Sequence, residues 1–131
     1  LLLGAFPRFT GSRPKGDIKN DLERALEMFP RLKERRNQLA GTLSGGEQQR
    51  LSIARAIINQ PEVIIADEPT GNLDPLNAYD IVQILKKIND LGTTVILTTH
   101  NKGIVDNLGR RVITMENGKV IRDEKDGRFI I

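Results

Sequence analysis

Two adjacent acids, Asp67 and Glu68, follow directly after an apolar run at residues 63–66. A continuous apolar run of this length is typical of a strand that is buried on both faces. Its end delivers both carboxylates to the carboxyl edge of a sheet, where ligands of open α/β sheets bind. One acid there can hold magnesium, and a second can orient or deprotonate an attacking water. Two acids that cap a loop are the structural alternative.

Residues 44–47 read Ser-Gly-Gly-Glu, which has the S-x-x-E form of a capping box. We expect Ser44 to cap a helix and Glu47 to fold back onto the Ser44 amide. The two glycines allow a ligand to approach the backbone, and a helix N-terminus with free N–H groups favours anions. An ordinary helix start would also explain the box, but residues 48–50 (Gln-Gln-Arg) extend the pattern beyond what a cap requires.

His100 is the only histidine, and it lies just past a β-branched run at residues 93–98. A lone histidine at a strand end is more often a surface residue than a ligand. We nevertheless expect His100 at the same sheet edge as Asp67 and Glu68, where it could meet a terminal phosphate.

Strand and helix signals alternate in the second part of the chain, which predicts a parallel α/β sheet. Asp74 and Pro75 are a suitable cap and first residue for a helix, and residues 116–118 (Glu-Asn-Gly) indicate a hairpin turn. The expected helices span residues 17–29, 45–59, 75–90 and about 101–109, with a short helical turn within 32–38. The expected strands span residues 63–66, 93–98, 112–115 and 119–121.

Composition limits the classes of function. The 131 residues suit one domain with an aliphatic core, since there is no Trp and only one Tyr. The net charge of +3 does not indicate nucleic-acid binding, because no basic run is interleaved with aromatic residues. The absence of cysteine excludes disulfides and thiolate metal sites and fits the cytosol. No apolar run approaches the roughly 20 residues of a membrane span.

The motifs together resemble the ATP-binding subunit of an ABC (ATP-binding cassette) transporter. Residues 43–50 are similar to the family signature, and residues 63–68 are similar to the Walker B strand with its catalytic glutamate. Residues 72–74 (Asn-Leu-Asp) look like the D-loop, and His100 looks like the switch histidine. Four motifs in the family's order argue against a chance match.

The resemblance implies an α/β fold: a partial P-loop NTPase of ABC type that lacks the Walker A strand, with parallel strands, flanking helices and a C-terminal hairpin. Residues 1–43 would be a remnant of the helical subdomain, and residues 44–131 would be the C-terminal part of the ATPase core. The complete parent would work with a second ATPase subunit and with permease subunits, on the cytoplasmic face of the membrane.

The resemblance also implies ATP and magnesium as cofactors and assigns roles to individual residues. Asp67 would bind magnesium, and Glu68 would act as general base. His100 would contact the γ-phosphate, and Asp74 would work across a dimer interface. The signature would contact ATP held by the opposite subunit, through Ser44, Gly45, Gly46, Glu47 and Gln48.

A phosphate loop of the form G-x-x-x-x-G-K-[ST] is not present in the 131 residues. Residues 11–16 come nearest, but Asp17 and Ile18 follow where Lys and Ser or Thr belong. We therefore expect the chain to start inside the helical subdomain. We also expect little or no ATPase activity from the chain alone, because general-base catalysis by Glu68 contributes only about 10²–10⁴-fold and cannot replace phosphate binding.

Two further hypotheses concern origin and association. Residues 1–43 are similar to ATPases of branched-chain amino-acid importers, and residues 50–131 to cell-division and lipoprotein-release ATPases, so a hybrid or engineered fragment is one hypothesis. The missing strand would leave a gap lined by unpaired backbone and apolar side chains. We expect the hairpin at residues 111–121 to collapse into that gap, or the chain to self-associate or to bind a complementary half-domain as a non-catalytic unit.

Overall fold

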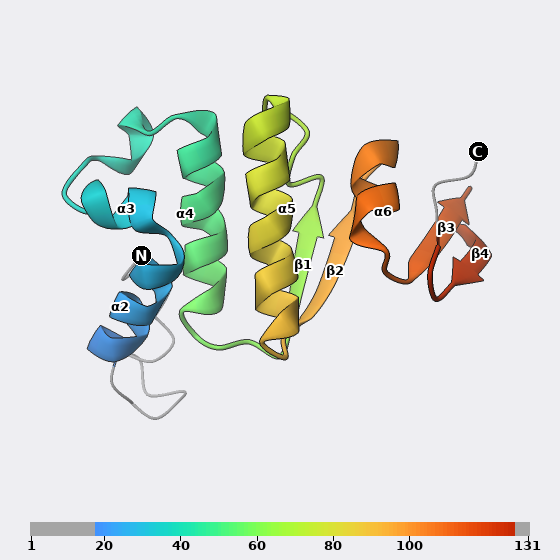
Figure 1. The fold of residues 1–131 in the computed structure, drawn as a ribbon, viewed down its shortest axis with the longest axis horizontal. Coiled ribbons are helices and arrows are strands. Elements are labelled where there is room, and N and C mark those ends of the chain that lie inside the picture. The colour runs from blue at the N-terminus through green and yellow to red at the C-terminus, as the bar shows by residue number, and fades with distance from the viewer. Residues whose placement is uncertain (1–17, 128–131) are drawn as a thin grey trace.

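The computed structural model describes residues 18–127 and shows helices packed on a short parallel sheet, followed by a separate hairpin (Figure 1). The predicted elements are all present, with bounds that differ by a few residues, except that Asp17 lies outside the described residues. In chain order they are α2 (Ile18–Met28), α3 (Pro30–Glu34), the 3-10 turn η2 (Ala40–Thr42), α4 (Gly45–Ile57), β1 (Val63–Asp67), α5 (Pro75–Asp90), β2 (Thr94–Thr98), α6 (Lys102–Leu108), β3 (Val112–Glu116) and β4 (Lys119–Glu124).

Strands β1 and β2 are parallel neighbours, and helix α5 connects them. Their register runs from Val63 opposite Thr94 to Asp67 opposite Thr98. A parallel pair requires a crossover of this kind, because the chain must return to the same end of the sheet before the second strand begins. The fold is therefore α/β, as predicted, and the polar ends of both strands meet at one edge.

The parallel sheet is buried on one face only. Ile64 is 6% exposed and faces the helices, whereas Val63 is 49% and Ile65 is 72% exposed on the opposite face. Ile96 on β2 shares that open face and is 50% exposed. The expectation of a strand buried on both faces is therefore wrong. The alternation arises because no element among residues 18–127 covers the second face.

A single apolar cluster joins the N-terminal helices to the sheet. Helices α2 and α3 pack against α4, α4 packs against α5, and α5 packs on β2. The cluster crosses the predicted division between residues 43 and 44. Its buried members are Leu26, Phe29, Leu32, Leu43, Ile53, Ala54, Ile64, Ile81, Leu85 and Ile88.

The hairpin β3–β4 forms a sheet of its own. Asn117 and Gly118 both have positive φ angles, 48° and 75°, as a two-residue type I′ turn requires. The expectation that this hairpin collapses into the gap beside β1 and β2 is wrong, because each of its strands pairs with the other and lies beyond α6 (Figure 1). The tight turn keeps the two strands together, so that their facing backbone groups pair within the hairpin.

Within the described part of the chain, no helix combines the length and the apolar character that crossing a bilayer demands.

Candidate functional site

The N-terminus of α4 carries the predicted capping box. The Ser44 side chain accepts a hydrogen bond from the Glu47 amide at 3.4 Å, and the Ser44 amide donates to Glu47 Oε2 at 2.9 Å. The hydrogen bond from the Ser44 backbone is the main cause that lowers the pKa of Glu47 below its ordinary value. Arg35 lies 3.1 Å from the same carboxylate. Glu47 thus stabilises the start of the helix, and it also forms an ion pair with Arg35.

The remaining signature residues shape the same helix end. Gln48 donates from Nε2 to the Leu43 carbonyl at 3.0 Å, which secures the chain as it enters the helix. Gly45 and Gly46 occupy the first turn, where backbone N–H groups have no carbonyl four residues earlier in the helix. These N–H groups and the helix dipole make this end suited to an anion.

The two acids at the end of β1 are bridged by Thr98 on β2. The Thr98 hydroxyl donates to Asp67 Oδ1 at 2.5 Å and accepts from the Glu68 amide at 3.1 Å. The Thr98 carbonyl also accepts from the Glu68 amide, at 3.2 Å. Sequence reasoning did not identify Thr98 as a site residue. The available signal was the Thr98 hydroxyl at the end of β2. It could be used only once the register placed Thr98 opposite Asp67.

His100 meets Glu68 at the same edge. The His100 Nδ1 atom lies 2.7 Å from Glu68 Oε1, so that the ring N–H donates to the carboxylate. Glu68 adopts a left-handed backbone conformation with φ of 42°, which is uncommon for a residue with a side chain. The His100 side chain is 85% exposed and remains accessible to a ligand.

Asp74 caps helix α5. Its Oδ1 atom accepts from the amides of Leu76 and Asn77, each at 3.1 Å, and its Oδ2 atom accepts from Asn77 Nδ2 at 2.6 Å. The Asn77 side chain is the largest cause that lowers the pKa of Asp74. The predicted cap and the predicted Pro75 start are both confirmed.

The candidate residues gather at one end of the molecule. The N-termini of α4 and α5 and the carboxyl end of β1 point the same way in Figure 1. Hydrogen bonds through Thr98 and His100 unite Asp67 and Glu68 into one group. Ser44 and Asp74 are each held at their own helix N-terminus.

The carboxylate oxygens at this edge suit a cation that takes its remaining ligands from water and substrate. Across residues 18–127, no three His, Asp or Glu side chains converge as a self-sufficient metal site. Magnesium is commonly bound by one or two carboxylates together with waters and substrate phosphates. The Asp67 carboxylate, oriented by the Thr98 hydroxyl, fits that kind of site.

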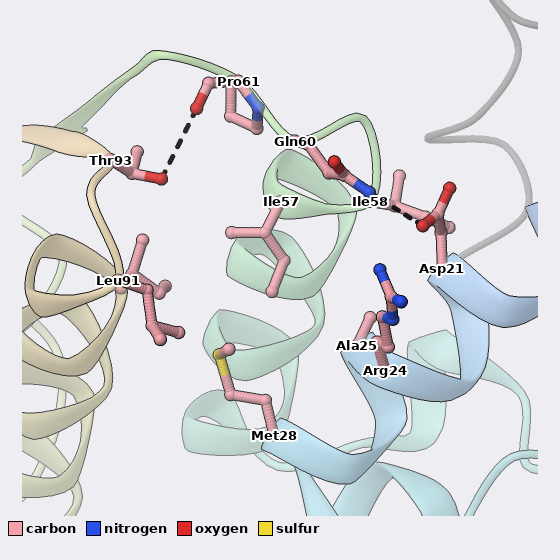
Figure 2. A pocket seen from close by; sticks show the side chains of 11 residues that line it. Asp21, Arg24, Ala25, Met28, Ile57, Ile58, Gln60, Pro61, Leu91 and Thr93 are labelled. Atoms are coloured by element: carbon pink, nitrogen blue, oxygen red, sulfur yellow. Dashed lines mark hydrogen bonds between the residues drawn. The ribbon is translucent and has the colours of Figure 1, made fainter. Parts of the chain in front are cut away.

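A half-open cavity of about 440 Å³ lies at the opposite end of the sheet, where β1 and β2 begin. Figure 2 shows Gln60 and Asp21 meeting at its rim, with a hydrogen bond of 2.8 Å between Gln60 Nε2 and Asp21 Oδ1. None of the candidate site residues lines it. Its walls are formed by Asp21, Arg24, Ala25, Met28, Ile57, Ile58, Gln60, Pro61, Ile88, Leu91 and Thr93.

Comparison with known proteins identifies the family. The profile of the ABC transporter family matches residues 4–71. The cell division ATP-binding protein FtsE of Streptococcus pneumoniae is 55% identical over 86% of this chain and 49% of its own length. The high-affinity branched-chain amino acid transport ATP-binding protein BraG of Pseudomonas aeruginosa is 40% identical over 92% of this chain and 50% of its own length.

A bacterial ABC transporter cassette solved as a dimer superposes with a TM-score of 0.67 and 41% sequence identity, over 84% of this chain and 47% of that one. The chain spans about half the length of the relatives that it matches. The α/β topology agrees with these matches. This chain belongs to the ABC transporter family of ATP-binding proteins.

Proposed function

We propose that this chain is part of an ABC-type ATPase subunit that binds MgATP and cleaves its β–γ bond to drive transport across a membrane. The observation that supports this most directly is the hydrogen-bonded group of Asp67, Glu68, Thr98 and His100 at the carboxyl edge of a parallel sheet. Ligands of open α/β sheets bind at this edge. The complete subunit would work on the cytoplasmic side of the membrane with permease subunits.

Asp67 would hold magnesium, with the Thr98 hydroxyl fixing one carboxylate oxygen. When bound, the metal neutralises charge on the β- and γ-phosphates. Glu68 would act as general base toward the attacking water. Its backbone is anchored by Thr98 and its carboxylate by His100, so that the base is oriented before the substrate arrives.

His100 would contact the γ-phosphate from the same edge. One side of its ring contacts the proposed base, because Nδ1 lies against Glu68. The rest of the side chain is largely exposed to solvent. The outer part of the ring is therefore available for a phosphate oxygen. His100 would then contact both the proposed base and the phosphoryl group that is transferred.

The signature residues Ser44 to Gln48 and the D-loop residue Asp74 would act on ATP held by a second subunit. The solved dimer of a similar cassette supports an arrangement of two copies. The free amides at the start of α4 supply the donors that a phosphate requires. Because the phosphate loop is not among these 131 residues, we propose that the chain alone has little or no ATPase activity.

Supplying the absent half in trans tests this function. Phosphate release and MgATP calorimetry would be measured for the chain alone and for the chain mixed with a polypeptide that carries the G-x-x-x-x-G-K-[ST] half of an ABC-type ATPase. We expect no turnover alone and turnover in the mixture. Glu68→Gln should lower the turnover by about 10²–10⁴-fold and leave nucleotide binding intact.

The matched control is Glu62→Gln, which removes an exposed carboxylate at the opposite end of β1. Equal turnover for the Glu68→Gln and Glu62→Gln variants would remove Glu68 from the mechanism. Saturable MgATP binding by the chain alone would instead show that these residues hold phosphate without a loop, and the proposed inactivity would be withdrawn.

A second candidate function is a non-catalytic folding or interaction unit that binds another copy of itself or a complementary half-domain. The exposed apolar face of the parallel sheet, formed by Val63, Ile65 and Ile96, favours it. Apolar side chains grouped on one open sheet face are typical of interfaces. Edge strands with free backbone groups add a second means of pairing.

A further inference from the structure

The side chain of Asn77 lies between the cap of α5 and the signature helix α4. Its Nδ2 atom donates to Asp74 Oδ2 at 2.6 Å. Its Oδ1 atom accepts from Arg50 Nη2 on α4 at 3.1 Å. One amide group therefore connects the D-loop carboxylate to the signature helix, with its donor on one side and its acceptor on the other.

The surroundings hold this amide in place. Gly46 is buried, and a Cβ atom there would lie only 2.7 Å from Asn77 Oδ1, so a glycine is needed for the amide to rest against α4. Arg50 also donates to Asp80 Oδ2 at 2.9 Å, and the Arg50 side chain is only 12% exposed. Both bonds come from the Arg50 Nη2 group, so the guanidinium cannot move away from Asn77 without also straining its bond to Asp80.

A purely local cap would not require this side chain. The Asn77 backbone amide already donates to Asp74 Oδ1, as any residue at that position could. The side-chain amide adds the link to Arg50, 27 positions earlier in the chain. Hydrogen bonds in such a series polarise one another, so a change at one end alters the strength of the bond at the other.

We propose that Asn77 is a positioning residue that joins the D-loop Asp74 to the signature helix α4, so that both move as one unit. This inference rests on the proposed function, in which both groups face ATP held by a second subunit. A fixed distance between Asp74 and the start of α4 would let binding of the second subunit position both groups at once. Asn77 does not itself touch the nucleotide in this arrangement.

The link is tested by titrating Asp74 by NMR in the whole chain, labelled with ¹³C and free of nucleotide. Arg50→Ala should raise the pKa of Asp74, because the amide loses its polarising partner. Asn77→Ala should also raise it. The double variant should show no larger shift than Asn77→Ala alone. Arg55→Ala, which removes an exposed charge from the same helix, is the matched control and should leave Asp74 unchanged.

An Asp74 pKa that ignores Arg50→Ala, or shifts that add fully in the double variant, would overturn the link. Asn77→Ser replaces Asn77→Ala if the alanine variant does not fold, since the short hydroxyl keeps a helix-start residue but cannot reach Arg50. The titration contains no ATP, so its result is independent of whether the proposed function holds. A confirmed link combined with an unchanged kcat for Asn77→Ala in the reconstituted mixture would overturn the positioning role.

Discussion

His100 Nδ1 lies 2.7 Å from Glu68 Oε1, although the two residues are 32 positions apart in the chain. Each follows a strand, and the parallel pairing of β1 and β2 brings both strand ends to one edge. The pair therefore follows from the topology rather than from any local motif. The carboxylate of Glu68, which we propose as general base, is oriented by a ring that is itself open to solvent.

Replacing His100 should impair turnover more than nucleotide binding. In the reconstituted mixture, His100→Ala removes both the partner of Glu68 and the contact proposed for the γ-phosphate. We expect phosphate release to fall by about 10²-fold, as for loss of one stabilising donor. The control Lys102→Ala alters an exposed residue two positions further on and should retain activity. Equal rates for the two variants would exclude His100 from the reaction.

The capping box predicts a stability effect confined to α4. Ser44→Ala removes the acceptor for the Glu47 amide and should lower the free energy of unfolding by about 1 kcal/mol, whereas Ser44→Gly should cost only a few tenths. Urea unfolding measures both. Ser52→Ala serves as control, because Ser52 lies on the same helix and bonds only back to the Gln48 carbonyl. A loss at Ser52 equal to that at Ser44 would contradict the cap.

The two signature glycines should respond differently to a methyl group. Gly46→Ala would place Cβ against the Asn77 amide, which is held by bonds to Asp74 and Arg50, and should destabilise the fold by about 1–3 kcal/mol. Gly45→Ala meets only Leu73 Cδ2, at 3.8 Å, and should be neutral or slightly stabilising. Thermal unfolding of the two variants measures this difference. Similar losses of stability in both would show that the close approach of Asn77 to Gly46 does not require a glycine.

Acid should weaken the fold partly through Asp74. Its pKa is lower in the folded chain than the ordinary value of about 3.9, because the Asn77 side chain and backbone amides bond to the ionised form. Ionised Asp74 therefore contributes stability at every pH above the unfolded value, and this contribution is lost as pH falls through the folded value. Urea midpoints should be level between about pH 5 and 8 and should fall below about pH 4.

The variant Asp74→Asn isolates that contribution. Asparagine is also a good helix cap, so most of the stability at neutral pH should remain. The acid-dependent part of the decline should shrink, because no carboxylate titrates at this position. Glu62→Gln, which changes an exposed acid just before β1, is the control and should leave the profile nearly unchanged. Identical profiles for all three proteins would show that Asp74 does not contribute to acid sensitivity.

The open sheet face predicts association. Ile65 is 72% exposed, and Ile65→Lys should lower the fraction of self-associated chain measured by sedimentation, because a charge cannot be buried there without a partner. Leu39→Lys changes a residue that is 78% exposed and precedes η2, away from the sheet, and should not alter association. A monodisperse monomer in both variants and in the parent would rule out self-association.

Local signals in the sequence determined the elements and their ends. The capping box at Ser44 and Glu47, the Asp74 cap and the Asn117-Gly118 turn each operate within a few residues, so their residue types alone specify the backbone. The placement of Asp67, Glu68 and His100 at one edge was also predictable, because alternating strands and helices imply parallel strands whose carboxyl ends coincide.

Tertiary structure decided what depends on distant partners. The apolar run at residues 63–66 is compatible with a strand buried on one face or on both faces. Ile65 is exposed because no element among the described residues covers its face of the sheet. The sequence of the hairpin likewise does not determine whether β3 and β4 join the parallel sheet or form a sheet of their own. The bridge of Thr98 to both acids and the bond of Asn77 to Arg50 require register and helix packing. Such contacts join residues about thirty positions apart, and no short-range spacing encodes them.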